Sequence, residues 1–336
     1  MKPDTQSRFR RSRRWIGLTC LIVAGLYAND GMLRFAATRN PGTRLNYVLT
    51  TSPRADSVTV LGSSLLANAI STPQLAQAID GSVIQLALGG QGLQEQALIW
   101  ELYLSRHRCQ TLVLELHEES LRIDGLPVPL REDRYAVHVN QPIVQRHLLA
   151  YSGVINVLCW QHLPMWSFAE FSHKVGWHDW VGYLKATPYD PHAPALYARS
   201  GSRLAATPRH QRRRPPATKP TAVDSAAVAA LNTILVLAKD AGVRVILVYP
   251  PRFGGDARDL GERDPGERNL GERNLGERDL SLVAPSALVR TPLFYFSQLP
   301  QTDPLLFDDW RHASAAGARQ FTQELANEIL RPLAMP

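Results

Sequence analysis

Three short stretches of the chain have residue types and spacing that suit nucleophilic catalysis. They are Gly62-Ser63-Ser64, Gly89-Gly90 and Asp309-Trp310-Arg311-His312. An aspartate three residues before a histidine lets its carboxylate fix the imidazole tautomer, so that the ring can act as a base toward a serine hydroxyl. Each motif alone is weak, because Gly-Ser-Ser is also a good helix N-cap and Asp-x-x-His occurs in many sequences. Their positions relative to secondary structure decide how much they mean.

The elements around these stretches are predicted to form a parallel sheet. The expected strands are 57–61, 82–88, 111–116, 243–249 and 293–296, and the expected helices are 65–79, 93–106, 222–241 and 315–330. Strands and helices that alternate in this way predict a parallel sheet covered on both faces. Because such sheets bind ligands at the carboxyl ends of their strands, the glycines and serines that follow the first two strands are expected to lie at the site. We predict one three-layer α/β/α domain over residues 50–336, with a mostly parallel five-stranded sheet.

The N-terminus combines positive charge with an apolar run. Residues 1–14 contain six basic residues and one aspartate, a net +5 out of the +7 of the whole 336-residue chain. Residues 15–28 follow without any charge, and we interpret 15–35 as an uncleaved signal anchor that crosses the cytoplasmic membrane once. The basic tail 1–14 then stays in the cytoplasm and residues 50–336 are periplasmic. A twin-arginine export signal at 12–16 predicts the same side, whereas a buried helix of a cytosolic domain is the alternative.

Charge and cysteine content exclude several classes of function. Outside the tail the net charge is only +2, so the basic balance does not indicate a nucleic-acid partner. Three cysteines are too few for a disulfide scaffold or a four-thiolate zinc site, although Cys109 and Cys159 could pair in an oxidising compartment. Four histidines fall in one region without a recognised ligand spacing: His107, His117, His138 and His147. We expect no metal and no cofactor.

Two stretches interrupt the α/β pattern. Residues 118–220 form an insertion rich in tryptophan and histidine, which could line a binding cleft, rest on the membrane interface, or form a helical subdomain with its own small core. Residues 256–280 contain a Gly-Glu-Arg pentapeptide repeat, whose period is far below that of solenoid units. We interpret this repeat as a low-complexity surface loop without a catalytic role.

Taken in order, the three motifs resemble those of the SGNH/GDSL hydrolase superfamily, and the anchor resembles its membrane-tethered branch, which includes DltD-like and alginate O-acetylation proteins. The resemblance covers residues 55–117 and 240–332 and implies a flavodoxin-like sheet. It makes Ser64 the nucleophile, His312 the base and Asp309 its orienting acid, with Gly90 and Gln91 at the oxyanion and substrate-binding position. The neighbouring Asp308 stays an alternative, but the three-residue spacing favours Asp309.

The resemblance implies serine-dependent acyl-ester chemistry outside the cytoplasm. The expected reaction is O-acetyl transfer to, or removal from, a cell-surface polysaccharide, with an acylated saccharide or acyl donor as substrate. Gly-Ser-Ser replaces the family's Gly-Asp-Ser, and its Gly-x-Asn-Asp block is not found. The alternative is therefore a catalytically silent partner of an integral-membrane acyltransferase. A nucleotide-binding protein that uses residues 89–92 as a phosphate loop is disfavoured, because no Lys-Ser/Thr pair follows that loop.

Overall fold

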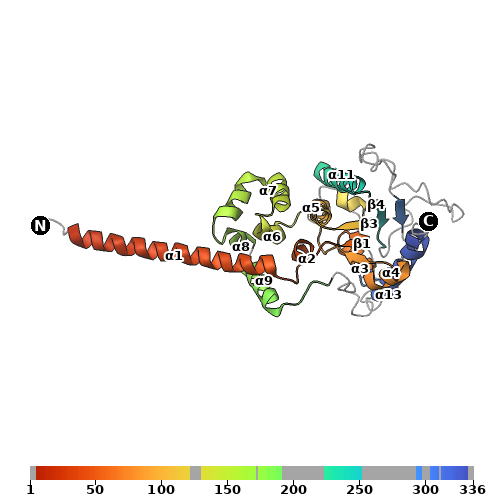
Figure 1. Cartoon of the computed structure of the whole chain (residues 1–336), viewed down its shortest axis with the longest axis horizontal. Helices are drawn as coiled ribbons and strands as arrows, with labels where there is room; N and C mark the ends of the chain where they lie inside the picture. Colours follow the sequence, from red (N-terminus) through yellow and green to blue (C-terminus); the bar gives the residue numbers. More distant parts are fainter. Residues whose placement is uncertain are drawn as a thin grey trace. The chain divides into compact units, whose positions relative to one another are not determined.

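A computed structural model gives the structure of the chain (Figure 1) and describes residues 5–121, 130–171, 173–190, 223–251, 293–296, 303–309 and 312–331. The chain divides into two compact units. Unit 1 comprises Met1–Tyr47 and Glu132–Tyr189, and unit 2 comprises Val48–Arg131 and Asp190–Pro336. The sheet and all the sequence-predicted site residues belong to unit 2. The Gly-Glu-Arg repeat at 256–280 lies outside the described residues.

Unit 2 is built on a parallel sheet. Its strands are β1 (Ala55–Leu61), β2 (Val83–Gln85), β3 (Arg108–Glu115), β4 (Arg244–Tyr249) and β5 (Leu293–Phe296), in the order β2-β1-β3-β4-β5. Every neighbouring pair is parallel, and Val58 of β1 lies in register with Val83 of β2 and Thr111 of β3. The α/β class with a parallel sheet is thus confirmed. In this strand order the direction of winding reverses between β1 and β3, and ligands of such sheets bind beyond the carboxyl ends at that point.

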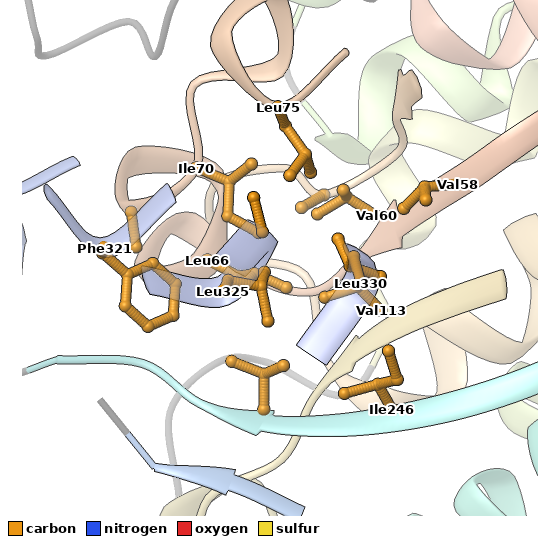
Figure 2. Close-up of a cluster of buried hydrophobic side chains, with 14 of the residues drawn as sticks. Val58, Val60, Leu66, Ile70, Leu75, Val113, Ile246, Phe321, Leu325 and Leu330 are labelled. Carbon is orange, nitrogen blue, oxygen red and sulfur yellow. The ribbon is translucent and has the colours of Figure 1, made fainter. Parts of the chain in front are cut away.

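Helices of unit 2 cover both faces of the sheet. They are α3 (Ser64–Ala69), α4 (Thr72–Ile79), α5 (Leu93–Leu104), α11 (Ser225–Asp240) and α13 (Ala315–Leu325), with short turns η1 (Glu118–Leu121), η6 (Pro304–Leu306) and η7 (Ala326–Leu330). Figure 2 shows the core between α3, α4 and α13 and the sheet, where Val60, Val113 and Ile246 face Leu66 and Phe321. The alternate strand residues are also buried, on the face toward α5 and α11, which pack together (Figure 1). Burial on both faces explains the nearly continuous apolar strands.

Two expected elements differ from those observed. The helix expected at 65–79 is two helices, because the backbone of Ile70 is extended after α3, and Pro73 lies in the first turn of α4, where its missing N–H costs no helical hydrogen bond. The strand expected at 82–88 is regular only over Val83–Gln85. Beyond it, the N–H groups of Leu86 and Leu88 still donate to β1 and its turn, at the carbonyls of Val60 and Gly62.

Unit 1 is helical. Its elements are α1 (Thr5–Arg39), the start of α2 (Arg44–Thr50), α6 (Glu132–Tyr135), η2 (Ala136–His138), α7 (Pro142–His162), α8 (Trp166–Phe171) and α9 (His173–Lys185). Among the described helices, one is long and apolar enough to cross a membrane, the Arg13–Arg39 part of α1, which contains the expected anchor 15–35. The C-terminal part of α1 packs on the other helices of unit 1 through a small core of Leu33, Ala37, Val137 and Phe168. Residues 132–189 of the insertion therefore share a compact unit with the N-terminal helix and not with the sheet.

Candidate active site

The turn between β1 and α3 holds the serines in a defined conformation. Ser63 is the N-cap of α3, and its hydroxyl accepts a hydrogen bond from the Leu65 N–H at 3.2 Å. Glu115, the last residue of β3, accepts three more bonds: from Ser63 N–H at 2.8 Å, from the Ser63 hydroxyl at 2.6 Å and from Leu66 N–H at 3.0 Å. A single carboxylate from the neighbouring strand thus ties down the first turn of the helix on which Ser64 stands.

Gly62 allows this carboxylate to come close. A Cβ atom on Gly62 would lie 2.6 Å from Glu115 Cβ and 2.8 Å from its Oε2 atom, closer than real Cβ atoms approach other heavy atoms. Glycine is required here for close contact, since any side chain would push β1 and β3 apart or displace the carboxylate.

Ser64, His312 and Asp309 form a connected chain of polar contacts. The Ser64 hydroxyl lies 3.0 Å from His312 Nε2, and His312 Nδ1 lies 2.8 Å from Asp309 Oδ2. The other oxygen of Asp309 accepts the His312 backbone N–H at 2.9 Å, so the carboxylate holds both the ring and its backbone. This is the nucleophile–base–acid order in which a serine hydroxyl can be deprotonated. The structure brings these three sequence-predicted residues together.

The structure also separates the two neighbouring aspartates. Asp308 is buried, and its N–H donates to the His312 carbonyl at 2.9 Å within the loop. Asp309 is about half exposed, with a side-chain exposure of 52%, and it is the one that contacts the imidazole. Trp310 and Arg311 between Asp309 and His312 lie outside the described residues.

A tight loop before α13 presents this Asp-x-x-His segment. Phe307 and Ala313 form an antiparallel bridge, which brings the two ends of the segment together. Ser314 closes the loop: its N–H donates to the Leu306 carbonyl at 2.9 Å, and its side chain caps α13 by accepting from Gly317 N–H at 3.2 Å. The imidazole therefore sits on a loop fixed at both ends, with its side chain 22% exposed.

Glu115 stays ionised beneath the serine turn. Its burial raises the pKa, but the nearby His117 and the bonds from Ser63 and Leu66 outweigh burial and hold the pKa below the ordinary value. His117 Nε2 lies 3.1 Å from Glu115 Oε1, and both side chains are almost fully buried. Glu115 was not predicted as a site residue. The available signal was a charged residue at the end of an apolar strand, at the edge where ligands bind.

The expected oxyanion loop follows β2. Gly90 has a φ of 71°, in the left-handed region that favours glycine. Its neighbour Gly89 lies beside the nucleophile, since a Cβ atom there would be 3.8 Å from Ser64 Cβ. The Gln91 side chain is completely buried, and its carbonyl accepts a bond from Gln96 Nε2 at 3.4 Å. Gln91 thus lies inward from the loop, whereas the two glycines form its turn.

The other histidines and the cysteines belong to different parts of the described structure. Among the described residues, no group of three or more His, Cys, Asp or Glu side chains could hold a metal ion. His107 is buried, with Nε2 3.0 Å from the Val48 carbonyl, and His138 belongs to unit 1. Cys109 and Cys159 are both free thiols.

Comparison with known proteins gives no independent assignment. No protein-family model matches the chain, and no curated protein is significantly similar to it in sequence.

Proposed function

We propose that this protein is a membrane-tethered, serine-dependent enzyme of acyl-ester chemistry, related to the SGNH/GDSL hydrolases. The observation that carries the proposal is the contact between the Ser64 hydroxyl and His312 Nε2, at 3.0 Å across 248 positions of sequence. The strand order β2-β1-β3-β4-β5, which is that of flavodoxin-like sheets, supports the same relationship.

The mechanism follows from the roles of the three side chains. Asp309 holds the Nδ1 proton of His312, so that the unprotonated Nε2 accepts the Ser64 proton as Oγ attacks the ester carbonyl. The developing oxyanion is bound by the N–H groups of Ser64 and Gly90, each of which supplies roughly 3–4 kcal/mol in comparable enzymes. The ester C–O bond then breaks, and the leaving alcohol takes the proton from His312. Water or a sugar hydroxyl resolves the acyl-enzyme by the reverse sequence, which gives hydrolysis or O-acyl transfer.

The location of the enzyme indicates its substrate class. The basic residues 1–14 precede the candidate span in α1, an arrangement typical of an anchor whose C-terminal part faces the periplasm. A periplasmic acyl-ester enzyme held at the cytoplasmic membrane would act on O-acetyl groups of a cell-surface polysaccharide. The half-exposed Asp309 and partly exposed His312 leave the catalytic side chains accessible to such a large substrate. The reaction uses no cofactor.

The test is ester hydrolysis by the full-length protein in detergent or nanodiscs. With p-nitrophenyl acetate, Ser64→Ala and His312→Ala should each lower kcat by roughly 10⁴-fold or more, because triad members act as a unit. Ser71→Ala is the matched control, since Ser71 is also a helix N-cap but makes no capping bond with its side chain. A fluorophosphonate should label the parent and the control but not Ser64→Ala. A parent that is neither labelled nor active would instead support the catalytically silent partner of a membrane acyltransferase.

A further inference from the structure

The second half of α7 is apolar on its outer face as well as its inner face. The helix is interrupted at Gly153, which has φ 82° and ψ 166°. After it, Val157 and Trp160 are buried, whereas the opposite face exposes three large aliphatic side chains: Val154 at 60%, Ile155 at 76% and Leu158 at 47%. The turn to α8 continues this surface with Leu163 and Trp166, both more than 40% exposed. We call Val154–Trp166, the second half of α7 together with its turn into α8, the apolar hairpin.

The sequence around the apolar hairpin lacks charge. Residues 147–169 contain no Asp, Glu, Lys or Arg, although 20% of the whole chain is charged. A helix that faces water normally carries polar residues on its outer face, and one that is apolar all round is buried in protein or lipid. Within the part of unit 1 that the structure describes, these side chains remain exposed. The hairpin therefore has the composition of a surface that contacts something apolar.

Contacts inside unit 1 hold the apolar hairpin against the candidate membrane span. Tyr27 of α1 donates its hydroxyl to the His162 carbonyl at 3.3 Å, and Asp30 accepts the Met165 N–H at 2.8 Å. One turn later, Arg34 bonds Asp30 at 2.6 Å and donates to the Trp160 carbonyl at 2.6 Å. These bonds join the α7–α8 turn to the stretch of α1 where the uncharged run of 15–28 ends.

Positions along α1 separate the apolar hairpin from the end of α9. Directly after the end of α1, Asn40 donates to Asp179 of α9 at 3.3 Å, and this contact lies 13 residues beyond Tyr27. At 1.5 Å per residue, these two levels are about 20 Å apart along the helix axis. The end of α9, with the exposed Lys185, therefore lies farther along the α1 axis from the N-terminus than the apolar hairpin does. A span of about 20 residues that begins at Trp15 would end near Arg34, so the hairpin contacts the outer end of the proposed span.

We propose that the apolar hairpin inserts into the outer leaflet of the same membrane that α1 spans, as a second, interfacial attachment. The inference rests on the membrane anchor of the proposed function. Apolar faces of interfacial helices are buried about 5–10 Å deep at the boundary between headgroups and acyl chains. Trp166 and Tyr27 are the aromatic types enriched at that level. Two attachments, one spanning and one interfacial, limit the tilt and rotation of unit 1 on the membrane.

Site-specific labels in the full-length protein test this proposal. An NBD fluorophore is attached to Ile155→Cys or Leu163→Cys in a background that carries Cys20→Ser and Cys159→Ser. Cys109 can remain, because burial raises its thiol pKa to about 12 and makes it a poor nucleophile. The labelled proteins are placed in nanodiscs of phosphatidylglycerol and phosphatidylethanolamine. Quenching of the NBD fluorescence is then measured with brominated acyl chains, which act from the lipid, and with iodide, which acts from the water.

Two control positions define the outcomes. A label at Val23→Cys reports the spanning part of α1, and one at Lys185→Cys reports the distant end of α9. We expect the hairpin labels to be quenched by brominated lipid as the Val23 label is, with an iodide quenching constant several-fold smaller than that of the label at Lys185.

If brominated lipid quenches only the Val23 label and iodide quenches the hairpin labels, the proposal is wrong while the anchor stands. Shielding from both quenchers would mean that a protein surface, such as a second copy, covers the hairpin, which also refutes it. If Val23 is not quenched by lipid, the anchor itself fails.

Discussion

Replacing Glu115 by Gln should weaken both the fold of unit 2 and catalysis, although Glu115 does not touch the reacting atoms. The carboxylate accepts three hydrogen bonds, two from Ser63 and one from Leu66, in a fully buried position. Hydrogen bonds to a charged acceptor contribute about 1.5–3 kcal/mol, whereas neutral ones contribute about 0.5–1.5 kcal/mol. Gln has the same size and keeps one acceptor, so the expected loss is about 1 kcal/mol per bond, or about 3 kcal/mol in total. This corresponds to a Tm lower by roughly 6–12 °C.

The variant should also lower kcat through the position of Ser64. Because Ser63 and Leu66 flank the nucleophile, loosening their bonds to Glu115 moves the Ser64 hydroxyl relative to His312. A displacement of about 1 Å can cost roughly 100-fold in rate. The loss should appear in kcat more than in KM, because Glu115 acts through the position of the nucleophile.

The stability difference should depend on pH in a defined direction. The pKa of Glu115 in the folded protein lies below its ordinary value of 4.5, despite burial, because His117 and its hydrogen-bond donors favour the charged form. A carboxyl group with a lowered folded pKa stabilises the fold fully above its unfolded pKa and loses that contribution as the pH falls through the folded pKa. The gap between parent and Glu115→Gln should therefore be largest above pH 4.5 and narrow in acid.

Thermal unfolding of the full-length protein, followed by circular dichroism at several pH values, measures the differences in stability. Ester hydrolysis by the same samples measures the difference in kcat. Glu328→Gln is the matched control, because Glu328 is exposed within η7 and its replacement should change stability by less than about 0.5 kcal/mol. If Glu115→Gln unfolds like this control and retains the parental kcat, Glu115 does not hold the serine turn in place.

Asp309, Gly317 and Cys109 can each be tested by a single change or reagent. Asp309→Asn should lower kcat by roughly 10⁴-fold, because the amide favours the wrong tautomer of His312, while thermal unfolding stays close to the parent's since Asp309 is half exposed. Gly317→Ala should destabilise unit 2 by about 1–3 kcal/mol, because the new methyl group would overlap the Leu306 carbonyl oxygen; equal unfolding temperatures would contradict this. In the native protein at pH 8, Cys109 should react with a thiol reagent only after denaturation, because burial raises its pKa to about 12.

The sequence alone was sufficient for the features that depend on local pattern. Apolar runs ending at Gly62 and before Gly89 indicate strands followed by turns, and both the parallel sheet and the N-terminal candidate span are confirmed. The three-residue spacing of Asp309 and His312 also suffices to pair them, because backbone geometry within one turn limits which atoms can meet. Predictions of this kind succeed since the relevant atoms are neighbours in the chain.

Tertiary structure decided the features that depend on distant contacts. The meeting of Ser64 with His312, the support of Glu115 beneath the serine turn and the grouping of residues 132–189 with α1 each join parts of the chain far apart in sequence. No local spacing encodes such contacts, because they arise only when strand order and helix packing bring separate segments to one edge or face. The apolar outer face of α7 likewise becomes visible only after folding has shown which of its apolar residues the protein itself buries.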